Sequence, residues 1–153
     1  MTYLERLKYL YQKTYNDLQR DFDDHCQRII IVKMKELQYV DMLKVKIEDQ
    51  LFDAITFNDR IINLGSFNIT DMYDNKYEAL FIKFLNKKEH CKEIEKYLEE
   101  SKPFDCLIKL LQLNLSGLKI EIEICVTTEI QTFGPPLIKE IICDVTCVIP
   151  EWD

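Results

Sequence analysis

The stretch from Leu118 to Ile149 constrains the fold most, because apolar and polar residues alternate along it. Every second residue from Ile120 to Ile130 is apolar or threonine, and charged or polar residues occupy most of the positions between them. A similar alternation runs from Leu137 to Ile149. The connecting residues 131–136 include one glycine and two prolines, which cannot extend a hydrogen-bonded ladder. The pattern predicts an antiparallel hairpin with one buried face.

Pairing the two apolar faces sets the register of this hairpin. Ile124 then lies opposite Cys143, and Glu123 lies opposite Asp144 on the other face. On the second strand the alternation puts Lys139 on the apolar face near the turn, where its head can reach water, and it puts Ile138 on the other face.

The predicted register gathers carboxylates on the face away from the core. Glu123 and Asp144 are opposite one another, and Glu121 lies two residues further along the same face. Like charges in this position destabilise a hairpin unless something compensates them. Mg²⁺ or Mn²⁺ could do so, as in phosphoryl-transfer sites, and so could a neighbouring lysine. A solvated face needs neither a metal ion nor a lysine, and this is the interpretation that we favour. Glu121, Glu123 and Asp144 remain candidate metal ligands.

The chain begins with a helix signal. Thr2 and Glu5 have the spacing of a capping box, and apolar residues recur at helical spacing from Leu4 to Phe22. We expect a helix from Tyr3 to about Cys26 whose apolar stripe faces the core. A seam with a partner helix is the alternative, although the pattern does not continue over the ~3–4 heptads that a coiled coil requires.

The segments between residues 28 and 57 allow both helix and strand interpretations. Residues 28–33 are short, apolar and β-branched, which favours a buried strand, although they could also continue the first helix. A second helix is expected from Glu36 to Phe57, with a strand over residues 43–47 as the rival interpretation. Residues 60–69 are expected to form a strand that Gly65 interrupts.

Two further helices are expected before the hairpin. One carries apolar residues from Tyr77 to Leu98 on one side and interleaved lysines and glutamates on the other, which indicates a solvated outer face. The next begins at Ser101 and Pro103 and ends at Gly117, which we expect to act as its C-cap and to lead the chain into the hairpin.

Length and composition indicate a single domain over residues 1–153. The hydrophobic fraction of 47% is enough for a core, and no apolar run approaches the ~20 residues of a membrane span. The first residues mix charges into each turn, unlike a secretory signal, so we expect a cytoplasmic protein whose six cysteines are thiols. The abundance of Ile, Lys, Asn, Tyr and Phe suggests an AT-rich coding genome, such as that of a bacterium of low GC content, a phage or another virus.

The net charge of −7 is concentrated toward the C-terminus. Residues 101–153 hold four basic and eight acidic side chains, a net charge of −4. Nucleic-acid binding requires a cationic surface, and no basic cluster of that kind is present, so direct binding to DNA or RNA is not expected. An acidic surface can instead attract a basic protein partner, or it can simply keep the chain in solution.

Two His-Cys dipeptides, His25-Cys26 and His90-Cys91, supply the right residue types for a zinc site or a Cys-His nucleophile. Their spacing argues against both sites, because neighbours on a helix point about 100° apart. No phosphate-binding loop, dinucleotide-binding motif, nucleophile elbow or zinc-protease motif is present either. Catalysis therefore has no motif to support it.

Two large aromatic residues lie at positions that are usually exposed to solvent: Phe133 at the hairpin tip and Trp152 near the C-terminus. Aromatic residues in such positions can anchor a partner, or they can fold back onto the core. Both are candidate partner-binding residues.

The sequence thus predicts an α+β fold, in which the C-terminal hairpin packs against three or four helices and gains strands near Ile30 and Ile62. The expected function is non-catalytic protein binding, as an inhibitor, adaptor or accessory subunit. The alternative is a Mg²⁺- or Mn²⁺-dependent enzyme acting on phosphates. A second alternative is a homo-oligomer that pairs the hairpin edge or the first helix with its copy.

Overall fold

A computed structural model describes residues 1–36 and 39–151, with only the backbone of Glu36, Tyr39 and Val40. Its helices and strands are, in chain order, α1 (Tyr3–Glu36), α2 (Tyr39–Thr56), β1 (Ile61–Asn68), α3 (Glu78–Leu85), α4 (His90–Glu99), α5 (Lys102–Asn114), β2 (Lys119–Glu129) and β3 (Leu137–Val148). Two short 3₁₀ helices, η1 (Thr70–Met72) and η2 (Asn75–Tyr77), join β1 to α3. The predicted α+β class is confirmed.

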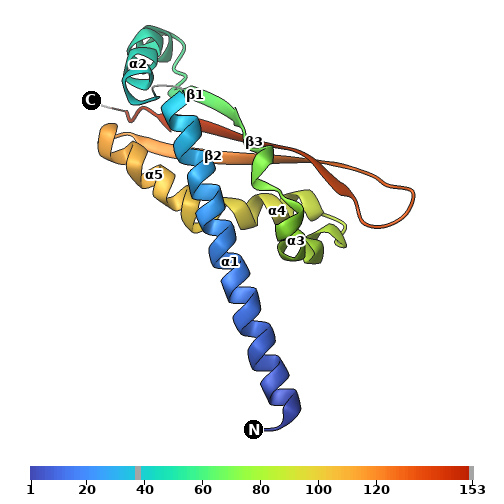
Figure 1. The fold of residues 1–153 in the computed structure, drawn as a ribbon. Coiled ribbons are helices and arrows are strands. Elements are labelled where there is room, and N and C mark those ends of the chain that lie inside the picture. Colours follow the sequence, from blue (N-terminus) through green and yellow to red (C-terminus); the bar gives the residue numbers. More distant parts are fainter. Residues whose placement is uncertain (37–38, 152–153) are drawn as a thin grey trace.

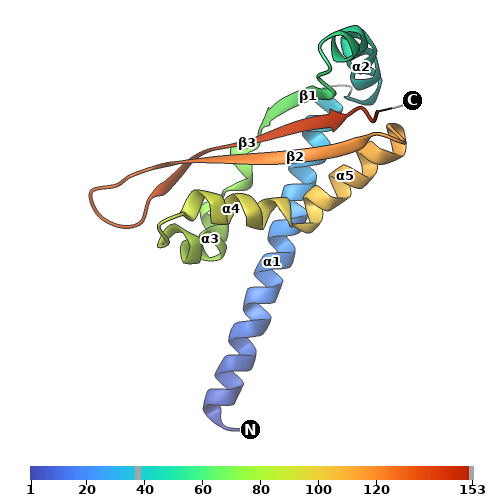
Figure 2. The ribbon, with the colours of Figure 1, turned by 180° about the vertical axis from the view of Figure 1, so that it is seen from behind.

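The strands form one antiparallel sheet in the order β1-β3-β2, so the strand predicted near Ile62 is confirmed. Helices α4 and α5 contact β2, α2 contacts β1, and α1 packs across α5. Figures 1 and 2 show α1, α4 and α5 on one side of the sheet, which we call the inner face, and α2 beside β1. No described helix lies over the opposite face, which we call the open face (Figure 2).

The hairpin has the predicted register, with Ile124 opposite Cys143 and Glu123 opposite Asp144. Near the turn, however, the register shifts between Thr127 and Thr128, and Lys139 is the extra residue of a β-bulge. One extra residue reverses the alternation of the strand. Ile138 therefore packs against the core and Lys139 is exposed, so the predicted faces of these two residues are wrong.

Helix α1 is longer than predicted, because residues 28–33 continue it. The strand expected near Ile30 is therefore wrong, and the alternative of a continued helix is confirmed. Phe22, Cys26 and Ile30 recur every four residues, and all three are buried in the core. Their packing along one side of a helix overrides the strand preference of the β-branched residues.

The segments around β1 follow the first interpretation of the sequence. Residues 39–56 are helical, so the rival strand over residues 43–47 is wrong. Gly65 lies at a bulge in β1, where its φ of 152° belongs to a region that side chains disfavour. The amide of Gly65 donates to Asn63 Oδ1 at 2.9 Å, which fixes this bulge.

The single helix predicted from Tyr77 to Leu98 is divided into α3 and α4. Residues 86–89 are all polar, so no apolar side chain holds them against the core and the chain can turn there. The turn allows α4 to lie along β2 (Figure 1). No helix within the described ranges is long and apolar enough to cross a membrane.

Candidate functional site

The predicted carboxylates lie on the open face of the sheet. Glu123 is opposite Asp144, and Glu121 is opposite Thr146. The hydroxyl of Ser66 on β1 donates a hydrogen bond to Asp144, and Lys119 Nζ lies 3.2 Å from Glu121 Oε1. A hydroxyl thus accompanies Asp144, and the lysine lies beside Glu121 rather than beside the opposed pair of Glu123 and Asp144.

A metal site at these positions stays a prediction. Within residues 1–36 and 39–151, no three or more His, Cys, Asp and Glu side chains are grouped so that they could hold a metal ion. Glu123 and Asp144 are brought together as a pair, while Glu121 is ion-paired with Lys119.

The two His-Cys dipeptides are held by different elements. His25 Nε2 lies 3.0 Å from the carbonyl oxygen of Asp71. His90 Nε2 lies 2.8 Å from Thr128 Oγ1, and Cys91 Sγ lies 3.6 Å from the same hydroxyl. Burial raises the pKa of the Cys26 thiol well above its usual range, which keeps this thiol protonated. Cys26 is therefore unsuited to be a nucleophile.

The feature that the sequence analysis missed is the first part of α1. Figure 1 shows this end of the helix projecting away from the rest of the molecule. Of the first eleven residues, seven are large hydrophobic side chains that the structure leaves exposed: Met1, Tyr3, Leu4, Leu7, Tyr9, Leu10 and Tyr11. The expectation that the whole apolar stripe faces the core is therefore wrong for this part of the helix.

We call residues 3–14 the free half of α1. The helical period places Tyr3, Leu4, Leu7, Leu10 and Tyr11 on one side, which we call the free stripe, and places Tyr9 on the opposite side. The same side of the helix continues into Leu18 and Phe22, which pack into the core. The stripe is therefore continuous, and the body of the protein covers only its second part.

The covered part of α1 is anchored by aromatic and polar contacts. The ring of Phe22 lies 5.1 Å from the ring of Tyr77 and 5.4 Å from that of Phe81. The hydroxyl of Tyr77 donates to Asp21 Oδ2 at 2.9 Å, and Lys76 Nζ lies 2.6 Å from the same oxygen. Hydrogen bonds from Lys76 and Tyr77 lower the pKa of Asp21. These contacts fix the direction in which the free half projects.

The free half is also basic. It contains Arg6, Lys8 and Lys13 against a single acidic residue, Glu5, so its net charge is 3 − 1 = +2 in a chain whose total is −7. Its N-terminal capping box is formed as predicted: the Glu5 amide donates to Thr2 Oγ1 at 3.2 Å, and the Thr2 amide donates to Glu5 Oε2 at 3.0 Å.

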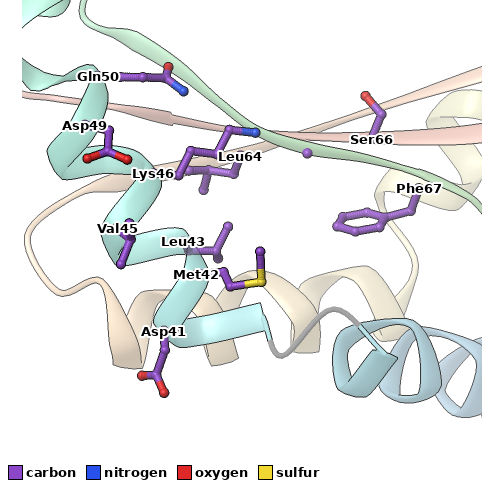
Figure 3. A pocket seen from close by; sticks show the side chains of 11 residues that line it. Asp41, Met42, Leu43, Val45, Lys46, Asp49, Gln50, Leu64, Ser66 and Phe67 are labelled. Carbon is purple, nitrogen blue, oxygen red and sulfur yellow. The ribbon is translucent and has the colours of Figure 1, made fainter.

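A second apolar feature is a groove of ≈ 680 Å³ between α2 and β1. Figure 3 shows Met42 and Leu43 of α2 and Leu64 and Phe67 of β1 around it. Its charged lining consists of Asp41, Lys46 and Asp49. The volume lies within the ~300–1,000 Å³ typical of ligand pockets, and the mixed charges give it little electrostatic preference.

The two edges of the sheet differ. On the β2 edge, the amides of Ile124 and Val126 donate to Glu99 Oε1 at 2.8 Å and to Glu95 Oε1 at 3.0 Å, both from α4. The β1 edge lies beside the groove, and β1 carries no charged residue. The homo-oligomer that pairs the hairpin edge with its copy loses support, because α4 already occupies that edge.

The hairpin tip exposes the predicted aromatic residue. The side chain of Phe133 is 88% exposed, and that of nearby Ile130 is 89% exposed. Phe133 therefore does not fold back onto the core. Trp152, the other candidate, lies outside the described residues.

Comparisons of this chain with protein-family models, with curated proteins and with solved structures find no match. The functional argument consequently rests on the surfaces described above.

Proposed function

We propose that this chain is a non-catalytic protein-binding module, an inhibitor, adaptor or accessory subunit, whose docking element is the free half of α1. The observation that carries the proposal is the free stripe, an apolar surface on a projecting helix. Contiguous apolar surface is costly to leave in water and marks interaction sites. A helix that presents residues at this spacing suits recognition by an apolar groove or face.

The charges of the free half indicate the chemistry of its partner. Arg6, Lys8 and Lys13 accompany the free stripe, so a suitable partner surface is apolar with acidic residues around it. The open face has the opposite character and suits a basic partner, as expected from the acidic C-terminal part of the chain. A cytoplasmic location and a phage or viral origin belong to this proposal on composition alone.

The test compares two glutamate substitutions on opposite sides of the same exposed helix. Leu7→Glu places a charge within the free stripe, whereas Tyr9→Glu places it on the other side, where the side chain is 61% exposed. Tagged wild-type and variant proteins are treated with a carbodiimide, which joins lysine amines to carboxylates, in extracts of the cells that encode the chain. Cross-linked peptides are identified by mass spectrometry.

We expect cross-links from Lys8 and Lys13 to a partner's acidic residues in the wild-type protein and in Tyr9→Glu, and their loss in Leu7→Glu. Equal melting temperatures of the two variants would show that both remain folded. The proposal is wrong if Leu7→Glu keeps every cross-link that the wild-type protein forms.

A further inference from the structure

The molecule carries two uncovered surfaces of opposite charge. The free half of α1 has a net charge of +2. The open face carries Glu121, Glu123, Glu129, Glu140 and Asp144 against Lys119 and Lys139, a net charge of 2 − 5 = −3. Neither surface can reach the other within one molecule, because the rigid covered part of α1 lies on the inner face of the sheet (Figures 1 and 2).

From this complementarity we infer that the free half of α1 binds the open face of a second copy of this chain. The inference rests on the proposed function, since it names the partner of the same docking element. It also gives the acidic open face a basic partner.

The open face offers apolar contacts between its charges. Ile142 and Val148 of β3 lie on it, next to Cys125 of β2 and Ile61 of β1 respectively, and none of these side chains belongs to the buried core. Ile61 is 58% exposed. Leu4, Leu7 and Tyr11 can pack on these residues, and a helix there would complete the sheet as a layer covered on both sides.

The dimensions also agree. Val148 and Ile142 are six residues apart on β3, about 20 Å at ~3.3 Å per residue. The free half from Leu4 to Thr14 covers about 15 Å at ~1.5 Å per residue. The free stripe therefore fits within the length of the acidic and apolar rows.

Two other self-contacts are less favourable. Pairing two free halves side by side would bring two segments of net charge +2 together over about three helical turns, fewer than a coiled coil requires. Docking in the groove between α2 and β1 would place the basic helix against Asp41 and Asp49 but also against Lys46. Of these three contacts between described residues, the one with the open face combines a strongly acidic character with exposed or half-buried apolar side chains.

A contact between two different surfaces has a defined consequence for assembly. It closes as a pair when each copy places its helix on the other's sheet, and otherwise it extends into a row. Multi-angle light scattering of the purified full chain distinguishes these outcomes from a monomer of 18.3 kDa. We expect a concentration-dependent mass of twice this value or more, and weaker association when salt is raised from about 0.05 M to about 0.5 M.

Charge reversal identifies the contact. Lys8→Glu with Lys13→Glu changes the helix, and Glu123→Lys with Glu140→Lys changes the open face. Either pair should weaken association roughly tenfold or more, and the four substitutions together should restore it. Glu48→Lys with Glu100→Lys, on α2 and after α4, is the control for charge alone and should leave the mass unchanged.

Three results would overturn the inference. The wild-type chain could be a monomer at every concentration, which removes the second copy but leaves the cross-linking test of the proposed function intact. Association could be lost in Leu7→Glu but not in the open-face variant, which would assign the contact to two helices. The fourfold variant could also remain as weak as either pair.

Discussion

The two halves of α1 carry the same kind of apolar stripe, but the stripe is buried in one half and exposed in the other. Phe22 and Cys26 are 1% exposed, whereas Leu4 is 61% and Leu7 is 45% exposed, although all four lie on one continuous side of the helix. The difference comes from what stands opposite them: aromatic side chains of η2, α3 and α4 in one case and solvent in the other. An apolar stripe on a helix therefore does not by itself show whether the rest of the same chain covers it.

The largest expected difference between the two halves concerns core packing. Phe22→Ala should lower the free energy of unfolding by about 3–5 kcal/mol, because it removes a ring that contacts Tyr77, Phe81 and Tyr97. Leu7→Ala, the matched change in the free half, should stay within about 0.5 kcal/mol. Urea unfolding at a concentration where the chain is monomeric measures both. Comparable losses would mean that the free half is packed in solution.

A smaller effect is expected from a polar anchor of the covered half. The hydroxyl of Tyr97 donates to Gln19 of α1, and burial raises the pKa of this hydroxyl to about 12. Tyr97→Phe should cost about 1 kcal/mol of unfolding free energy, since it leaves the Gln19 oxygen without its donor. Tyr11→Phe in the free half, where the side chain is 73% exposed, should cost nothing measurable in the same urea experiment. A loss in Tyr11→Phe would contradict the distinction between the halves.

The smallest expected effect depends on pH. Lys76 and Tyr77 lower the pKa of Asp21 from its usual 3.8. A depressed pKa in the folded state contributes stability above the unfolded-state value, and this contribution is lost as pH falls through the folded-state pKa. The melting temperature of Asp21→Asn should therefore lie below that of the wild-type protein at neutral pH and converge with it at acidic pH, below the lowered pKa of Asp21. Calorimetry between these limits measures this convergence, and a constant difference would exclude the carboxylate as its source.

The parts of the fold that were predicted correctly are those that depend on the spacing of residues close together in the sequence. The period of two predicted β2, β3 and the Glu123–Asp144 register, and the Thr2–Glu5 spacing predicted the capping box. The bulge at Lys139 was missed because a single inserted residue leaves the composition of the strand unchanged while exchanging its faces. The division of α3 from α4 was missed because apolar spacing continues across the break.

The periodicity of α1 does not show that its first part is exposed, but the length of the whole helix does. A helix of 34 residues is about 51 Å long at ~1.5 Å per residue. A compact domain of this size has a radius of gyration of about 15 Å, so its diameter is roughly 40 Å. A helix longer than its own domain must project from it. Because a strand was predicted over residues 28–33, the predicted first helix was too short to show that it must project from the domain.

The carboxylates of α4 have a consequence for the motions of the sheet. Because Glu95 and Glu99 receive the edge amides of Ile124 and Val126, this helix occupies the place of a fourth strand along β2. Detaching α4 would expose two backbone donors at once, so the helix and the strand should open as one cooperative unit. The amides of Ile124 and Val126 should then exchange their hydrogens together with those of α4, on a timescale separate from the rapid exchange of the projecting end of α1.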